Sequence, residues 1–172
     1  MYLLFVCIVL LLFMMTGFHR GLIGSLLHLS STLFGLWVAM QYYQPFSDYL
    51  RLFLPFPKTL AYDAHYVLSL NQPEVRFDRV CGFIIIVLIV KTMMYMVFSS
   101  VSRIFGSRHR SLILRILGIG TGLVSGVIFL HFVSYIAVLI PYPQLQTYIA
   151  ETQLGQWFVL KVPLLSEMTL HL

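Results

Sequence analysis

Three ionisable side chains lie inside long apolar stretches of the sequence, where they could bind an ion or move a proton: His28, Lys91 and His131. Tyr95 follows Lys91 by one helical turn, so the two side chains would share a helix face. A lysine at the middle of a membrane-spanning helix costs about 2.5–3.5 kcal/mol on insertion scales and rarely faces lipid. These four residues therefore form a candidate intramembrane polar site that could line a path for an anion or a proton.

The same residues also have a purely structural interpretation. Lys91 could be neutral, or it could extend its side chain toward a membrane interface. Each histidine, His28 or His131, could donate a hydrogen bond to a backbone carbonyl of a neighbouring helix. The sequence leaves both interpretations open for Lys91 and favours the structural one for each histidine.

Patterns that support catalysis or cofactor binding are missing from the sequence. It has no HExxH or GxSxG pattern and no carboxylate in its long apolar stretches. The glycine-rich stretch GIGTGLVSG (118–126) lies inside an apolar run, where the strand that a nucleotide-binding loop requires cannot precede it. Cys7 and Cys81 are isolated from each other and from histidine clusters. We expect no catalytic activity, no metal, no cofactor and no nucleic-acid partner.

The composition is that of an integral membrane protein. Of the 172 residues, 59% are hydrophobic and 10% are charged, and the mean hydropathy is +0.90. Ordinary soluble domains are about 25% charged, and a soluble fold of this size could not bury so much apolar surface. The lipid bilayer is therefore the first expected partner, and residues 1–172 are predicted to form a single membrane domain.

Four apolar stretches are long enough to be membrane-spanning helices, given that a bilayer core needs about 20 helical residues. They cover approximately residues 2–18, 22–43, 80–101 and 116–140. Pro141 and Pro143 end the last one, because proline cannot continue the helical hydrogen-bond ladder. The predicted fold class is an all-α membrane protein with four transmembrane helices and short interfacial amphipathic helices.

Two segments outside these spans are predicted to lie at a membrane interface. In the loop 44–79, a short amphipathic helix is indicated by the spacing of Phe46, Tyr49, Leu50 and Phe53. In the tail 141–172, Trp157 is predicted to anchor the chain at the interface together with Phe158.

The distribution of arginine predicts how the protein is oriented. The first and third connections between spans contain no acid and five arginines, Arg20, Arg103, Arg108, Arg110 and Arg115. Short connections rich in arginine stay in the cytoplasm, so both termini and the loop 44–79 should be extracytoplasmic. The same arginines are expected to attract anionic lipid head groups, and docking of a cytoplasmic partner is the alternative.

Small residues recur at four-residue intervals and predict where helices pack closely. Such strips allow close backbone approach between helices in lipid. They predict contact between the second and fourth spans, either within one chain or between the chains of a homo-oligomer. The residues concerned are Gly17, Gly21, Ser25, Gly35, Ala39, Gly118, Gly122 and Gly126.

In order along the chain, these features resemble the colicin V production protein family (CvpA), small proteins of the bacterial inner membrane. The resemblance covers nearly the whole chain. It lies in a first hairpin with a glycine, a basic residue and a second glycine, in an alanine near the end of the second span, and in a glycine ladder that opens the last span. The matching residues are Gly17, Arg20, Gly21, Ala39, Gly118, Gly122 and Gly126.

The resemblance implies a multi-pass protein of the plasma membrane that acts without catalysis in toxin or bacteriocin production, secretion and envelope homeostasis. Secretion or envelope proteins would then be its partners. The alternatives are a small oligomeric transporter or channel with Lys91 in the solute path, and a scaffold that recruits partners through its arginine-rich loop.

Overall fold

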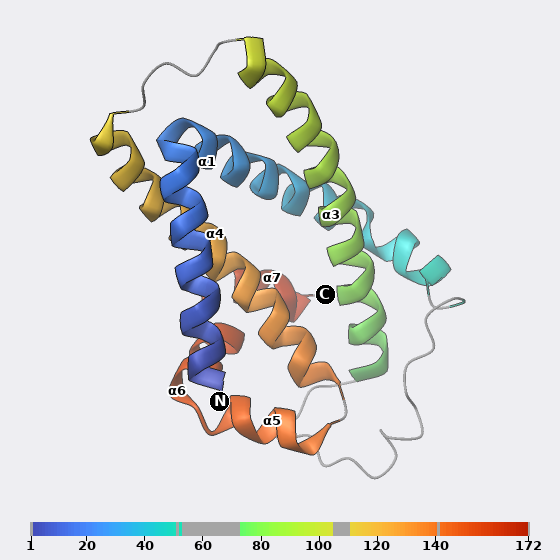
Figure 1. Ribbon diagram of the computed structural model, residues 1–172. Helices are drawn as coiled ribbons and strands as arrows, with labels where there is room; N and C mark the ends of the chain where they lie inside the picture. The colour runs from blue at the N-terminus through green and yellow to red at the C-terminus, as the bar shows by residue number, and fades with distance from the viewer. Residues whose placement is uncertain (1, 51, 53–72, 105–110, 141, 172) are drawn as a thin grey trace.

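The computed structural model describes residues 2–50, 52, 73–104, 111–140 and 142–171, and this part of the chain consists of helices without strands. The long elements are α1 (Tyr2–Leu50), α3 (Pro73–Ile104) and α4 (Leu112–Leu139) (Figure 1). Within the described residues, these three are the helices long and apolar enough to cross a membrane. Many of their large apolar side chains are exposed, as expected for surfaces that face lipid. Examples are Leu4, Ile23, Leu88, Met93 and Ile113.

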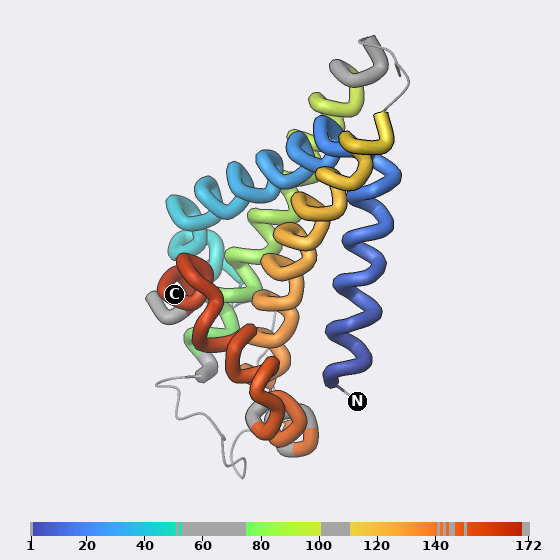
Figure 2. The backbone as a smooth tube through the Cα atoms, turned by 90° about the vertical axis from the view of Figure 1, so that its left-hand side faces the viewer, coloured from blue at the N-terminus to red at the C-terminus, as the bar shows by residue number. Residues whose placement is uncertain are grey.

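α1 is bent at Gly21, which divides it into a first arm (2–20) and a second arm (22–50). Gly21 has φ 68° and ψ 177°, a combination that is essentially restricted to glycine. Its location matches the connection predicted between the first two spans. The Ser25 hydroxyl donates to the Gly17 carbonyl oxygen at 3.1 Å and so links the two sides of the bend. Figure 2 shows the second arm running obliquely away from the bend, while the first arm lies beside α4.

The helices extend further than the sequence predicts on both sides of the loop 44–79. α1 continues through Pro45 to Leu50, and α3 begins at Pro73. Phe46 to Leu50 therefore form the last turns of α1 and not a separate helix, and their place at a membrane interface stays a prediction. Its fourth apolar position, Phe53, lies outside the described residues.

The glycines of α4 pack against the first arm of α1, not against the second arm as predicted. A Cβ atom added to Gly118 would collide with backbone atoms of Gly17 and Gly21. One added to Gly122 would lie 2.5 Å from the carbonyl oxygen of Phe13, and one added to Gly126 would lie 3.1 Å from the Phe13 Cβ. The predicted contact with this strip is confirmed at Gly21, but its other contacts are with the first arm and not with the second.

The strip on the second arm of α1 faces α3. A Cβ added to Gly35 would lie 3.2 Å from the carbonyl oxygen of Val87, and Ala39 one turn further on is fully buried. Nearer the end of the arm, Ser47 lies against Gly82, whose added Cβ would be 3.3 Å from the serine Cβ. α3 therefore runs antiparallel to the second arm, with Gly35 opposite Val87 and Ser47 opposite Gly82.

The C-terminal segment folds back onto α4. It comprises α5 (Pro143–Ala150), α6 (Gln153–Gln156), the π-helical turn η1 (Trp157–Lys161) and α7 (Leu165–His171). Trp157 is partly exposed, whereas Phe158 is buried, so the prediction that Phe158 anchors the chain at the interface is wrong. The buried apolar face of the segment consists of Ile149, Phe158, Val159, Val162 and Leu165.

Candidate functional site

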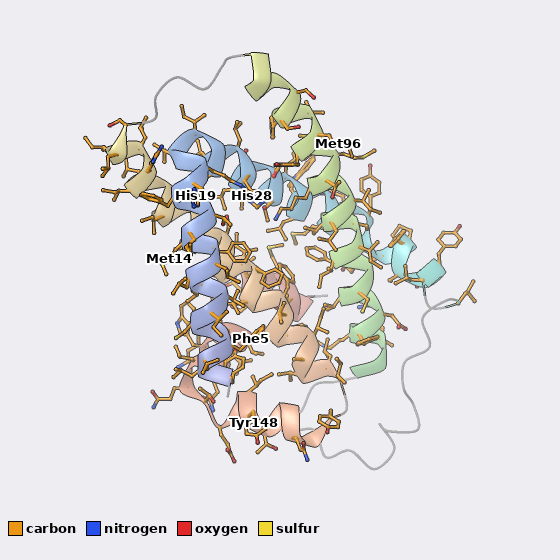
Figure 3. The ribbon with its side chains drawn as sticks, viewed as in Figure 1. Phe5, Met14, His19, His28, Met96 and Tyr148 are labelled. Atoms are coloured by element: carbon orange, nitrogen blue, oxygen red, sulfur yellow. The ribbon has the colours of Figure 1, made fainter. Side chains whose placement is uncertain are left out.

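Four polar side chains from both arms of α1 and from α3 gather beside the bend: Arg20, His28, Lys91 and Tyr95. We call them the kink cluster. The Arg20 guanidinium carbon lies 6.0 Å from the centre of the Tyr95 ring, within the range of a cation–π contact. The positive charges of Lys91 and Arg20 both act on the His28 ring. Figure 3 shows His28 on the second arm, just past the bend.

The antiparallel register between the second arm and α3 explains why these residues meet. His28 precedes Gly35 by two helical turns, and Lys91 follows Val87 by one. Because Gly35 and Val87 are in contact and the two helices run in opposite directions, His28 and Lys91 lie on the same side of that contact. Tyr95, a further turn along α3, lies at the level of Arg20.

The structure places three of the four predicted polar-site residues together and places the fourth elsewhere. His28, Lys91 and Tyr95 belong to the kink cluster, whereas the His131 ring contacts residues of the C-terminal segment. Grouping His131 with the others is therefore wrong. Arg20 takes its place in the cluster, although the sequence indicated a role in orientation and in attracting lipid head groups for this arginine.

Two of the five predicted basic-loop residues can be located, and they lie at the same end of the molecule. The Arg115 guanidinium carbon is 5.9 Å from the centre of the Phe18 ring, so it lies near the bend that also carries Arg20. The Arg103 side chain and residues Arg108 and Arg110 lie outside the described parts of the chain. The bend, the end of α3 and the start of α4 all lie toward the top of Figure 1, at the same end of the molecule.

His131 belongs to a second group, which holds the C-terminal segment against α4 and in which His131, Tyr135 and Thr169 are buried. Its Nδ1 atom lies 2.6 Å from the Phe158 carbonyl oxygen, and its Nε2 atom lies 3.3 Å from Oγ1 of Thr169. The Tyr135 hydroxyl donates to the Thr169 carbonyl oxygen at 3.0 Å and accepts from Arg76 at 3.3 Å. We call His131, Tyr135, Thr169 and Arg76 the tail clasp.

Sequence reasoning missed three members of the tail clasp. Tyr135 lies one turn after His131 and could have been found by the same spacing that links Lys91 to Tyr95. Arg76 and Thr169 come from distant segments, and no local pattern marks them. The hydrogen bond from His131 to a carbonyl is of the kind that the structural interpretation of this histidine predicts.

The two groups differ in their chemistry. The kink cluster contains two basic side chains, an imidazole and a phenol, and the tail clasp joins side chains to one another and to two backbone carbonyls. What the kink cluster can do chemically is attract an anion. What the tail clasp can do is fix the position of α7 and η1.

One of three comparisons with known proteins gives a match. No curated protein matches the sequence, and no solved structure matches it. The model of the family described as Colicin V production protein matches residues 4–163, a range that includes the bend, α3, α4 and η1. With its apolar helices, the chain has the features of a membrane protein. The chain belongs to the colicin V production protein family.

Proposed function

We propose that this protein is an integral component of the bacterial plasma membrane that supports the production and secretion of a colicin V-like toxin without catalysing a chemical step. The observation that carries the proposal is the family match over residues 4–163. The absence of a catalytic pattern in the sequence is consistent with it. A role in envelope homeostasis and contacts with secretion or envelope proteins are part of the same proposal.

The proposal includes four membrane crossings, two of which are made by α1. At 1.5 Å per residue, a straight helix of its length would measure roughly 73 Å, more than twice the thickness of the hydrocarbon core. The bend at Gly21 divides it into two arms, of which the first alone would measure about 28 Å. Each arm is therefore long enough to cross once, with the second arm strongly tilted.

The positions of Arg20 and Arg115 support an orientation with the bend in the cytoplasm. Both lie at the end where α1 bends and where α3 ends and α4 begins. Arginine-rich connections are retained on the cytoplasmic side. Both chain termini then lie on the extracytoplasmic side.

A small oligomeric transporter with Lys91 in the solute path is the second candidate function. One observation favours it: Arg20 lies close enough to Lys91 to add a second positive charge there, which would attract an anionic solute. A membrane scaffold is the remaining alternative, and the arginine-rich connection containing Arg108 and Arg110 would be its recruiting surface.

Complementation of a deletion strain tests these proposals. The strain makes a colicin V-like toxin but lacks its own family member, and toxin activity is measured in cell extracts and in the culture medium. The wild-type chain should restore activity in the medium, and failure to do so at normal membrane abundance would contradict the proposed role. Loss of rescue with Lys91→Met alone favours transport, whereas loss with Arg108→Gln and Arg110→Gln alone favours recruitment.

A further inference from the structure

α7 is joined to η1 by a tight turn whose central residue is strained. Leu164 has φ 67°, and within the described residues it is the one residue other than glycine with a positive φ. Across it, the Leu165 amide donates to the Pro163 carbonyl oxygen at 2.9 Å. The left-handed region is unfavourable for a residue with a Cβ atom. The Leu164 side chain is 76% exposed, so little packing of its own holds the turn in this conformation.

The contacts between α7 and α4 are few, and their polar part is made by one residue of α7. The Tyr135 hydroxyl donates to the Thr169 carbonyl oxygen at 3.0 Å, and His131 Nε2 lies 3.3 Å from the threonine hydroxyl oxygen. On the apolar side, Leu165 is buried and Met168 packs against the core. α7 is seven residues long, and a helix of that length is not stable alone in water. Its position and its conformation therefore both depend on this small contact.

The side chains that Thr169 contacts on α4 are polar and lie near an end of the molecule that water can reach. The Tyr135 hydroxyl also accepts a hydrogen bond from Arg76, which is in the first turn of α3. In the proposed orientation, this end is on the extracytoplasmic side. Polar groups can exchange hydrogen bonds within the protein for hydrogen bonds to water at a modest net cost. Uncovering these side chains therefore costs less than uncovering an apolar surface of the same size.

We propose that α7 is a strap that opens about Leu164 while the long helices stay folded, and that its opening exposes His131 and Tyr135 of α4. Opening releases the Tyr135 hydroxyl, whose hydrogen bond the Thr169 carbonyl oxygen accepts in the closed state. The family match ends at residue 163, so it includes the two α4 residues but not α7. The strap is independent of the role in toxin production, and the two proposals can fail separately.

The reaction of single cysteines with a water-soluble thiol reagent tests whether α7 opens separately. The purified full-length chain carries Cys7→Ser and Cys81→Ser as the background. Ser166→Cys places a thiol on the buried side of α7, and Ser47→Cys places one at the end of α1, where the serine is buried to a similar degree (8% and 4% exposed). Exposed Glu167→Cys gives the rate of an uncovered thiol on α7.

The two buried thiols should react at different rates if the strap exists. Ser166→Cys should react at least about tenfold faster than Ser47→Cys, because local opening needs less free energy than opening of the packed long helices. Equal rates for the two, each far below that of Glu167→Cys, would overturn the proposal, because α7 would then open only together with the long helices.

Substitutions at Leu164 test whether this residue is the hinge. Combined with Ser166→Cys, Leu164→Gly should slow the reaction about threefold, the net result of the strain relieved in the closed turn and the greater freedom of glycine in the open chain. Leu164→Ala is the matched control: it keeps a Cβ atom and therefore the strain, and should leave the rate nearly unchanged. Equal rates for the two variants would overturn Leu164 as the hinge.

Discussion

The position of Lys91 along its own helix differs from its position relative to the neighbouring helix. Counted along the predicted span 80–101, this lysine lies near the middle of an apolar helix. In the structure, Tyr95 one turn later lies beside Arg20 at the bend of α1. Lys91 therefore lies near the end of the contact between α3 and the second arm of α1, and not at the centre of that contact.

The hydroxyl group of Tyr135 is expected to stabilise the fold through the tail clasp. Tyr135 is 1% exposed, and its hydroxyl bonds to the Thr169 carbonyl oxygen and to Arg76. Tyr135→Phe keeps the ring and removes both hydrogen bonds, so the buried carbonyl oxygen of Thr169 loses this donor. This should cost about 1–3 kcal/mol. Thermal unfolding in detergent should show a lower midpoint temperature.

Tyr148→Phe is the matched control for this prediction. Tyr148 is 55% exposed on α5, so the loss of its hydroxyl should leave the midpoint temperature nearly unchanged. Equal midpoints for wild type and Tyr135→Phe would show that the tail clasp contributes no net stability.

Residue spacing predicted the kink cluster better than it predicted the tail clasp. Lys91 and Tyr95 are one turn apart on a single helix, so their common face could be found without a structure. The partners of His131 are a backbone carbonyl of η1 and a threonine of α7. A backbone carbonyl has no sequence signature, and long-range pairing of this kind depends on how the tail folds back.

At the scale of elements, the bend at Gly21 decides which helices meet. The strip of small residues on α4 was predicted from its four-residue spacing, but such a strip does not specify its partner. Because α1 turns back at Gly21, its first arm lies along the Gly118–Gly126 face and its second arm is directed to α3. The positive φ of Gly21, which sets the direction of the second arm, could not be predicted from the sequence.

Close contact between α4 and the first arm is expected to depend on the absence of a side chain at Gly122. A Cβ there would lie 2.5 Å from the Phe13 carbonyl oxygen, which belongs to the backbone and cannot rotate away. Gly122→Leu should therefore push the helices apart at a cost of at least about 1–3 kcal/mol. The expected result is reduced abundance in the membrane and a lower unfolding midpoint in detergent.

Gly120→Leu provides the control on the same helix. An added Cβ at Gly120 meets no atom within 4 Å, so a side chain there should project away from the first arm. Its abundance and midpoint should remain close to those of the wild type. If both variants were equally impaired, leucine in α4 would be harmful for reasons other than this contact.

At the scale of the whole molecule, the chain divides into a basic end and a tail end. The bend carries Arg20, and Arg115 lies nearby against Phe18, while α5 and the N-terminus lie at the opposite end in Figure 1. The apolar composition was sufficient to predict a membrane protein, and the arginine pattern predicted that these connections share a side. The helix boundaries around the loop 44–79 were wrong, because polar residues such as Asp78 continue α3 beyond its apolar part.

Single cysteines at the two ends should react differently with a thiol reagent that cannot cross membranes. In a background with Cys7→Ser and Cys81→Ser, His19→Cys places a thiol beside the bend, whereas Tyr49→Cys and Glu151→Cys place thiols near the end of α1 and after α5. All three side chains are exposed. If α1 crosses twice, Tyr49→Cys and Glu151→Cys should be labelled in intact cells, and His19→Cys only after permeabilisation.

The pattern of labelling distinguishes an error in orientation from an error in the number of crossings. Labelling of His19→Cys alone in intact cells would reverse the orientation while keeping two crossings by α1, since the bend would still be opposite to both other sites. Labelling of His19→Cys together with Tyr49→Cys would contradict the second crossing, because the arm between them would then begin and end on one side. The second arm is the crossing that this pattern tests most directly, because it runs obliquely to the first arm and a tilted helix uses more of its length to reach the opposite interface.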